Sequence, residues 1–396
     1  MNFPSPPPVV ATSGHAGSLS LRGADERATR QLDFIQALRG VAVLLVVGYH
    51  YQHFLDGEAY SSLGPRLFER GAIGVDLFFV LSGFIMVFAT RADGSGPGMA
   101  VRFAIKRLTR IAPPYVFWTL VMWLVTRGLP NPAFDVDGLE WIRTLSFQPL
   151  EPGSAAPFFG YPLLYVGWSL SYEMYFYGMF AASLLAPGRW RWVALLGLAV
   201  TGLVAVPALS GRGLHADALL HYHLPGMLNV AANPLIWEFL AGVVIGHLFL
   251  GPARIRDRGL AGSLLALALG VVLWQYAAGV RSGHGVTRAG PSVIALVLFA
   301  ALYAKSYPVR VPAWLRWVGD VSYSLYLVHV IPTMIARHHK APTTSGMAMF
   351  VACFVLSLVA AYWSHRLLER GVCEWLKDAA LRPFGRGEPR PVAPLA

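Results

Sequence analysis

The chain has 396 residues and a formal net charge of +11 at pH 7; 55% of its residues are hydrophobic and 13% are charged. Together with a mean hydropathy of +0.51, this composition excludes a single water-soluble globule, because apolar runs long enough to cross a bilayer recur along the whole chain. Membrane topology and attraction to anionic lipid account for the excess of cations, which leaves no need for a nucleic-acid partner.

The apolar runs predict an all-α, polytopic membrane protein of about ten transmembrane helices. Residues 1–31 are rich in Pro, Ser, Gly and Ala, so we expect a disordered cytoplasmic tail there, followed by a transmembrane domain over 32–370 and a short cytoplasmic tail over 371–396. Each span needs about 20 largely apolar residues. The predicted spans are 34–55, 73–90, 112–127, 163–186, 191–208, 233–250, 259–279, 289–305, 321–337 and 347–368.

The first span contains two ionisable residues, Arg39 and His50, in the stretch LRGVAVLLVVGYH. A charge inside a transmembrane helix costs about 2.5 kcal/mol or more, so it usually has a function. Eleven residues make about three helical turns, so both side chains share one face and lie about 16 Å apart along the axis. Two structural explanations stay open: Arg39 could pair with Glu173 or Asp76, and His50 could be a hydrogen-bonded interior histidine.

The loop predicted after the second span sets the orientation, because cytoplasmic loops are enriched in Lys and Arg. It carries five cations, whereas the loop predicted over 128–162 holds carboxylates. Both termini are therefore predicted to face the cytoplasm. The five cations are Arg91, Arg102, Lys106, Arg107 and Arg110.

Two of these cations form the Arg-x-x-Arg of RLTRIAPPY. Arg107 and Arg110 lie at i and i+3, just before Pro113 and Pro114, which predict the start of a helix. They could bind phosphate groups, or they could only be positive-inside anchors.

Polar side chains recur in four later spans, within GVDLFFVLSGFIM, WSLSYEMYFY, NPLIWEFLAG and SYSLYLVH. Such groups must face the protein interior or a wet cavity, so we predict one polar cavity inside the bundle. Packing is the alternative for the aromatic residues and for Glu173 and Glu238. The candidate cavity or acceptor-binding residues are Asp76, Ser82, Trp168, Ser169, Tyr172, Glu238, Ser322, Tyr326 and His329.

Taken in this order, the motifs resemble those of the acyltransferase-3 family, bacterial membrane proteins that O-acylate exopolysaccharides and other surface glycans. The resemblance covers about residues 32–370 and is closest to the exopolysaccharide acetylases. It implies a multi-pass protein of the bacterial inner membrane. It also implies an acyl-CoA donor, acetyl-CoA in the simplest case, a glycan or glycolipid acceptor, and Arg107 and Arg110 as ligands of the donor's phosphates.

Acyl transfer to an alcohol needs a base, and His50 is the natural one because the ordinary pKa of histidine lies near neutrality. The predicted topology places His50 towards the periplasm and Arg39 towards the cytoplasm, where a permanent cation suits the phosphate end of acyl-CoA. Glu173 and Glu238 are expected to orient His50 or polarise the acceptor. No Gly-x-Ser-x-Gly elbow is present, so we expect direct transfer, with an acyl-histidine intermediate as the alternative.

No metal or bound cofactor is expected. His215, His221 and His223 have loose metal-like spacing, but no acidic or cysteine partner lies near them in the sequence. A different class of protein, a multi-pass transporter or exporter, would also place charges in the membrane. Transporters usually show a weak internal repeat and broken helices, and we find no repeat.

Overall fold

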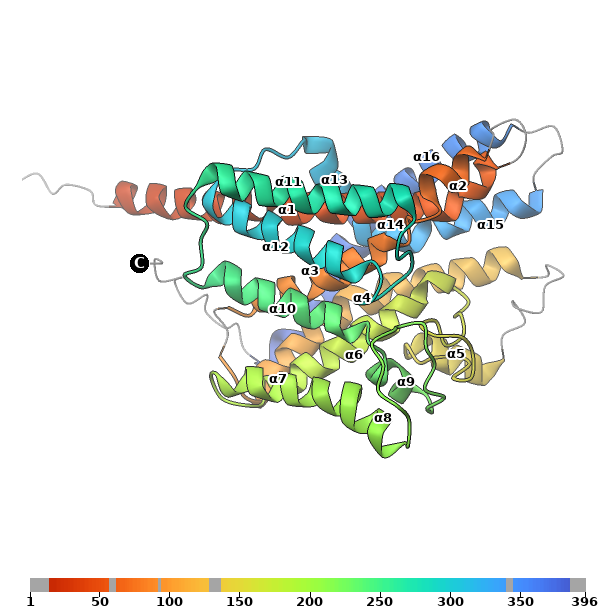
Figure 1. Ribbon diagram of the computed structural model, residues 1–396, viewed down its shortest axis with the longest axis horizontal. Helices are drawn as coiled ribbons and strands as arrows, with labels where there is room; N and C mark the ends of the chain where they lie inside the picture. The colour runs from red at the N-terminus through yellow and green to blue at the C-terminus, as the bar shows by residue number, and fades with distance from the viewer. Residues whose placement is uncertain (1–13, 57–61, 92–93, 128–136, 340–344, 385–396) are drawn as a thin grey trace, which may run out of the picture.

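The computed structural model describes residues 14–56, 62–91, 94–127, 137–339 and 345–384; of residues 14–31 it describes the backbone alone. Every regular element within these ranges is a helix, which confirms the all-α fold. Most of the long helices run side by side along the horizontal direction of Figure 1.

The structure gives fewer candidate membrane spans among its described residues than the sequence predicts. Among the described residues, six helices are long and apolar enough to cross a membrane, and the bent pair Ala313–Asp320 and Ser322–Arg337 makes a possible seventh. The count of about ten is therefore not confirmed. Three of the predicted spans correspond to helices that are too short to cross the hydrocarbon core at 1.5 Å per residue: α6, Trp168–Ser183, α10, Ile236–Leu250, and α12, Gly290–Ser306.

Helix α1, Gly14–Tyr51, packs against α3, Ile73–Ala89, and α3 packs against α10. The α3–α10 crossing is close because each helix contributes a glycine. A Cβ atom on Gly83 would lie 2.0 Å from the Phe239 carbonyl oxygen, and one on Gly242 would lie 2.0 Å from that of Val80. Small residues of this kind let helix backbones approach in membrane proteins.

Helix α4, Pro97–Thr126, differs most from the sequence prediction. We expected the helix to start at the two prolines, but Pro113 and Pro114 lie inside it, so Arg107 and Arg110 are on the helix rather than in a loop. A proline inside a helix leaves the carbonyl four residues earlier without its usual donor. For Pro114 that carbonyl belongs to Arg110, and the Cys373 thiol lies 3.9 Å from it.

The C-terminal helices continue past residue 370, where we predicted a tail to begin. Helix α16, Gly346–Ser364, runs into the π-helix η6, His365–Cys373, and then into α17, Glu374–Leu381, and both η6 and α17 pack on α4. At the other terminus α1 begins at Gly14, within the predicted tail of residues 1–31. Residues 1–13 and 385–396 lie outside the described residues.

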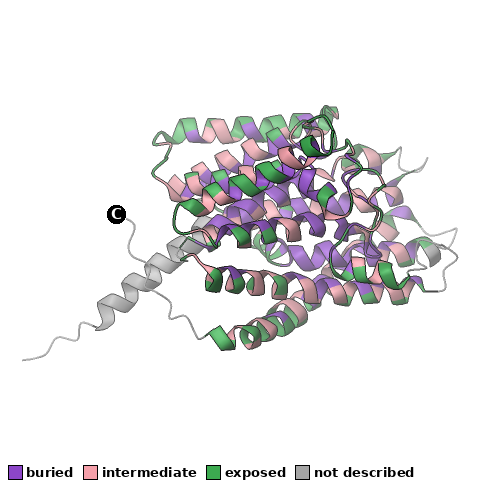
Figure 2. Ribbon diagram, turned by 90° about the horizontal axis from the view of Figure 1, so that it is seen from below, coloured by how far each residue is buried: buried purple, intermediate pink, exposed green. Residues whose placement is uncertain are grey.

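The remaining helices surround this core. Helices α7, Trp190–Val200, and α11, Arg258–Ala278, carry exposed apolar side chains such as Leu196 and Leu267, which is 63% exposed. Buried residues gather along the inner faces of the bundle in Figure 2. Large exposed apolar surface of this kind is typical of contact with membrane lipid. The shorter helices are α2, Leu63–Phe68, α5, Gly138–Leu145, α8, Val206–Leu209, α9, Met227–Ala232, α13, Ala313–Asp320, α14, Ser322–Val328, and α15, Val330–His339.

Candidate active site

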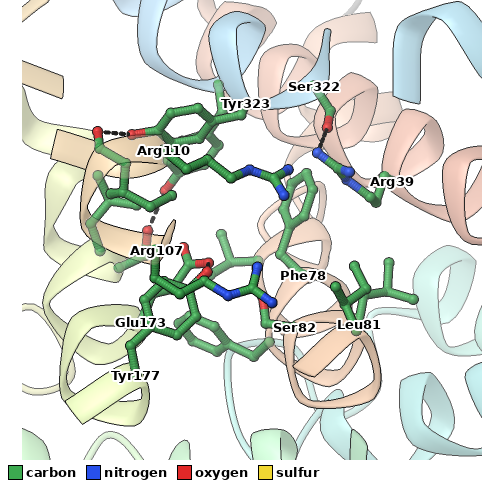
Figure 3. A pocket seen from close by; sticks show the side chains of 17 residues that line it. Arg39, Phe78, Leu81, Ser82, Arg107, Arg110, Glu173, Tyr177, Ser322 and Tyr323 are labelled. Carbon is green, nitrogen blue, oxygen red and sulfur yellow. Dashed lines mark hydrogen bonds between the residues drawn. The ribbon is translucent and has the colours of Figure 1, made fainter. Parts of the chain in front are cut away.

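A cavity of about 80 Å³ lies between α1, α3, α4, α6 and α14 (Figure 3). It has a polar side formed by arginine, serine and tyrosine side chains and an apolar side formed by residues such as Phe78 and Leu81. Eight of the residues singled out in the sequence line it together: Arg39, Ser82, Arg107, Arg110, Ser169, Glu173, Ser322 and Tyr326.

The guanidinium groups of Arg39, Arg107 and Arg110 face one another across this cavity (Figure 3). Arg39 donates hydrogen bonds to Ser322 Oγ at 2.9 Å and to Gln36 Oε1 at 3.4 Å. Arg39 therefore does not form the ion pair with Glu173 or Asp76 that the sequence analysis left open as the alternative to a functional role.

Aromatic rings hold Arg107, and one carboxylate lines the cavity together with the arginines. The Arg107 guanidinium lies 5.4 Å from the ring centroids of both Phe103 and Tyr177, within cation–π range. Glu173 is the only carboxylate among the described residues that line this cavity, and it accepts a hydrogen bond from the Tyr177 hydroxyl. Three cations facing one carboxylate make the cavity suitable for an anion.

His50 lies outside this cavity, paired with His329. Nδ1 of His50 is 2.9 Å from the Val46 carbonyl oxygen and 3.1 Å from Nε2 of His329, whose own Nδ1 is 3.0 Å from the Leu325 carbonyl oxygen. A carbonyl accepts only from an N–H, so we assign a proton to Nδ1 of each ring. The single Nδ1 proton of His50 is then shared between the Val46 carbonyl oxygen and Nε2 of His329. Nε2 of His50 keeps a free lone pair, the form that a base needs.

The surroundings of the histidine pair are aromatic. The ring centroids of Tyr49 and Tyr165 lie 5.1 and 5.4 Å from that of His50. His50 itself is half-buried. Tyr326 connects this pair to the cavity: it lines the cavity, and its ring centroid is 6.1 Å from that of His329. Its hydroxyl is 2.7 Å from Ser169 Oγ. Glu173 does not contact His50.

Asp76 belongs to a separate buried cluster. Its carboxylate is 2.7 Å from Nδ1 of His284 and accepts a hydrogen bond from the Gly285 N–H at 2.9 Å. Glu238 is fully buried and, like Asp76, does not line the cavity. Asp76 therefore holds the loop before α12. We did not predict His284, because an isolated histidine in the glycine-containing loop RSGHGVTRAG has no helical period to mark it.

Two further aromatic candidates also lie away from the cavity. The Trp168 ring centroid is 5.5 Å from that of His284, and the Tyr172 hydroxyl donates to the Pro157 carbonyl oxygen at 2.8 Å. Both side chains are buried. This is what we expect if these aromatic residues only pack, the alternative left open for them in the sequence analysis.

The three outer-loop histidines do not converge on one point. The His215 ring stacks on Tyr222 with centroids 4.1 Å apart, whereas His221 and His223 face each other at 4.1 Å. The part of the chain that the structure describes contains no group of three or more side chains that could hold a metal ion.

Comparison with known proteins gives a family and several relatives. The model of a family described as an acyltransferase domain matches residues 32–366. The exopolysaccharide production protein ExoZ of Rhizobium meliloti (strain 1021) is 29% identical over 308 residues, which cover 76% of this chain and 90% of that protein. The putative membrane-bound transacylase BcsY of Komagataeibacter xylinus is 28% identical over 89% of this chain and 86% of its own length.

A more distant relative is the putative peptidoglycan O-acetyltransferase YrhL of Bacillus subtilis (strain 168). It is 23% identical over 90% of this chain, and the match covers 56% of that protein. No solved structure matches the chain.

Proposed function

The chain belongs to the acyltransferase-3 family and is a multi-pass membrane acyltransferase, and we propose that it moves an acyl group from acyl-CoA to a hydroxyl of a cell-surface or exported glycan. One observation supports this proposal: α1 holds Arg39 in an arginine-lined cavity and, about 16 Å further along its axis, holds His50 in contact with His329. The names of the relatives support a polysaccharide acceptor.

On the donor side, Arg39, Arg107 and Arg110 would bind the phosphates of acyl-CoA. Hydrogen bonds from guanidinium to phosphate are charge-assisted and roughly twice as strong as neutral ones. A cavity of about 80 Å³ has the space of two to three waters at about 30 Å³ each, so it suits a slender chain or an acetyl group rather than a nucleotide. Glu173 would balance part of the positive charge and hold Tyr177.

On the acceptor side, Nε2 of His50 would take the proton of the attacking hydroxyl. The hydroxyl oxygen then bonds to the thioester carbon, the carbon–sulfur bond breaks, and the coenzyme thiolate leaves and is protonated. His329 would keep His50 in the required tautomer through their 3.1 Å contact. The acyl group would reach His50 past Tyr326 and Ser169.

The half-exposed Tyr161 would add a neutral sugar-binding group on the acceptor side. Burial first, and the nearby Tyr49 second, raise the pKa of Tyr161 to about 12. Its phenol therefore stays neutral at physiological pH and can both donate and accept hydrogen bonds with a sugar hydroxyl.

The proposed function is tested with purified protein in liposomes and with cells. We expect the protein to release free coenzyme thiol from acetyl-CoA when glycan acceptor is present. We also expect mass spectrometry to find ester-linked acyl groups on the surface glycan of a complemented strain and not of a deletion strain. Glycan that keeps its acyl groups in the deletion strain, with no thiol release in vitro, would favour the transporter alternative.

The donor site predicts a specific kinetic change. Replacing both Arg107 and Arg110 with Gln should raise the apparent KM for acetyl-CoA at least tenfold, because one hydrogen bond to a charged group contributes about 1.5–3 kcal/mol. The KM for the acceptor should change little. Arg102→Gln is the matched control, since Arg102 is on the same helix and does not line the cavity. An unchanged KM for acetyl-CoA would leave both arginines as topology anchors.

A further inference from the structure

A second, larger cavity adjoins the first. Its volume is about 330 Å³, within the range of small-molecule sites, and it shares Arg39 and Arg110 with the arginine-lined cavity. Its remaining walls come mainly from η6 and α17, through residues that include His365, Arg370 and Lys377. Residues 367–377 lie beyond the part of the chain that the family model matches, which ends at residue 366.

The side chains of this cavity favour an anion. Five cations line it, and three carboxylates accompany them. Glu374 pairs with Lys377, and Glu369 lies 3.3 Å from Nδ1 of His365 and accepts a hydrogen bond from Ser324. Two of the three carboxylates therefore already have partners, and because Lys377 is one of those partners, four cations and Asp320 remain to face a ligand. The five cations are Arg39, Lys106, Arg110, Arg370 and Lys377.

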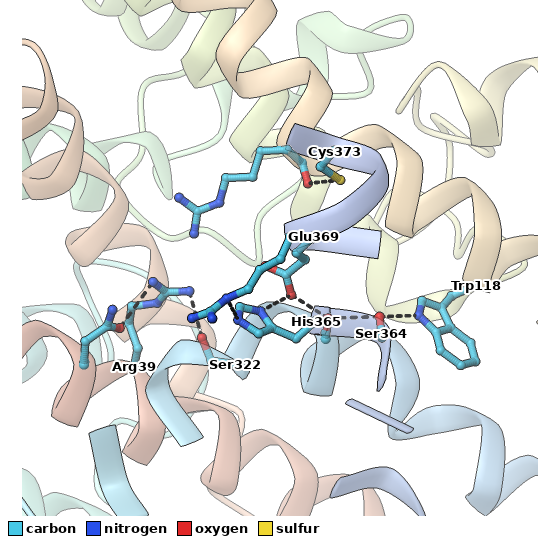
Figure 4. Close-up of polar contacts among 11 residues, drawn as sticks. Arg39, Trp118, Ser322, Ser364, His365, Glu369 and Cys373 are labelled. Atoms are coloured by element: carbon cyan, nitrogen blue, oxygen red, sulfur yellow. Dashed lines mark hydrogen bonds and ion pairs between the residues drawn. The ribbon is translucent and has the colours of Figure 1, made fainter. Parts of the chain in front are cut away.

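A chain of polar contacts fixes η6 against the bundle, as Figure 4 shows. Arg370 Nε donates to Nε2 of His365 at 3.0 Å, and His365 and Ser324 meet at Glu369. Because Nε2 of His365 accepts a hydrogen bond from Arg370, the ring proton of His365 is on Nδ1, the nitrogen that faces Glu369.

The same chain reaches α4 at its other end. Ser324 Oγ and the Trp118 indole each lie 2.9 Å from Ser364 Oγ. Cys373 adds the contact with the Arg110 carbonyl described above. These contacts hold the π-helix η6 in place, so Arg370 stays at the wall of the cavity. A π-helix is a rare conformation that is frequent at functional sites.

We propose that this second cavity binds the nucleotide end of acyl-CoA, with Arg370 as a donor-binding residue presented by η6. The inference rests on the proposed function, because it takes acyl-CoA as the donor. The wide cavity would hold the adenosine and its 3′-phosphate beside Arg370. The diphosphate would lie where Arg39 and Arg110 line both cavities and Arg107 lines the narrow one, and the arm that carries the acyl group would continue into the narrow cavity. A guanidinium matches phosphate geometry with two parallel hydrogen bonds.

The test compares two donors on full-length protein in liposomes of neutral lipid. Acetyl-CoA carries the nucleotide and S-acetylpantetheine does not. Arg370→Gln should raise the KM for acetyl-CoA about tenfold and leave the rate with S-acetylpantetheine unchanged. Inhibition by adenosine 3′,5′-bisphosphate should weaken by a similar factor. Arg366→Gln is the matched control: Arg366 is an exposed cation on the same π-helix, its guanidinium donates to the Tyr362 hydroxyl at 3.1 Å, and it does not line the cavity.

Each other outcome overturns the inference in a distinguishable way. An unchanged KM for acetyl-CoA in both Arg370→Gln and Lys377→Gln, or an equal loss with the two donors, rejects the nucleotide site and leaves the proposed function intact. If the KM of Arg370→Gln for acetyl-CoA differs from that of wild type only in liposomes that contain anionic lipid, the phosphate that Arg370 binds belongs to a lipid headgroup instead. If wild-type protein uses neither donor, the proposed function itself fails.

Discussion

His50→Ala is expected to lower the rate of acyl transfer by about 10²–10⁴-fold, the usual contribution of a general base, while the protein still folds and inserts. The ring is half-buried at the end of α1, and its contacts are the carbonyl oxygen of Val46 and Nε2 of His329. Removing it deletes the base assigned to the acceptor hydroxyl, and the Nε2 lone pair that this frees on His329 belongs to a fully buried ring. The fall should appear in kcat, because the base acts in the transition state and contributes little to donor binding.

The measurement is acyl transfer to glycan by purified His50→Ala protein, with its amount in the membrane matched to wild type. His53→Ala is the control. His53 lies in the segment just after α1, the Arg337 side chain is 3.4 Å from its ring, and it has no assigned part in the reaction. A well-expressed His50→Ala protein that acylates glycan normally would end the base mechanism and return His50 to a packing role.

The helical period predicted part of the site correctly. His50 follows Arg39 by eleven residues, which placed both on one face of α1. In SYSLYLVH, Ser322, Tyr326 and His329 follow one another at spacings of four and three residues, which places them on one face of the span predicted over 321–337. In the structure the two stripes meet: Arg39 bonds to Ser322, and His50 contacts His329. Periodicity gives the face of each helix, and a polar residue in lipid needs a polar partner. Which stripe meets which was not predicted, because the sequence analysis named only Glu173 and Asp76 as partners of Arg39.

The same rules could not separate the two polar residues of α3. Asp76 and Ser82 lie on one helix and look equally suited to a cavity, yet Ser82 lines it and Asp76 binds His284. That difference depends on where the loop before α12 folds, and the helical period of the sequence does not encode this.

The prolines of α4 misled the prediction for a related reason. Their lost hydrogen bonds are tolerated where other parts of the protein approach the freed carbonyl, as Cys373 does at Arg110.

The orientation of the chain remains a prediction, and it determines from which side each substrate arrives. Lys106, Arg107 and Arg110 lie on the first half of α4, and cations at helix ends favour the cytoplasmic side. The second cavity lies at this end, so the donor would enter from the cytoplasm, where acyl-CoA is made. His50 would then face the periplasm, where an exported glycan can reach it.

Labelling of single cysteines should therefore give an all-or-none contrast in intact cells. Gly98 and Gly153 are matched positions, because both are exposed and a Cβ atom at either meets no atom within 4 Å. In a background in which the buried Cys353 and Cys373 are replaced by Ala, Gly153→Cys should react with a membrane-impermeant thiol reagent. Gly98→Cys should react only after the cells are permeabilised. The opposite pattern would turn His50 towards the cytoplasm, and the acceptor would then have to be a cytoplasmic molecule rather than an exported glycan.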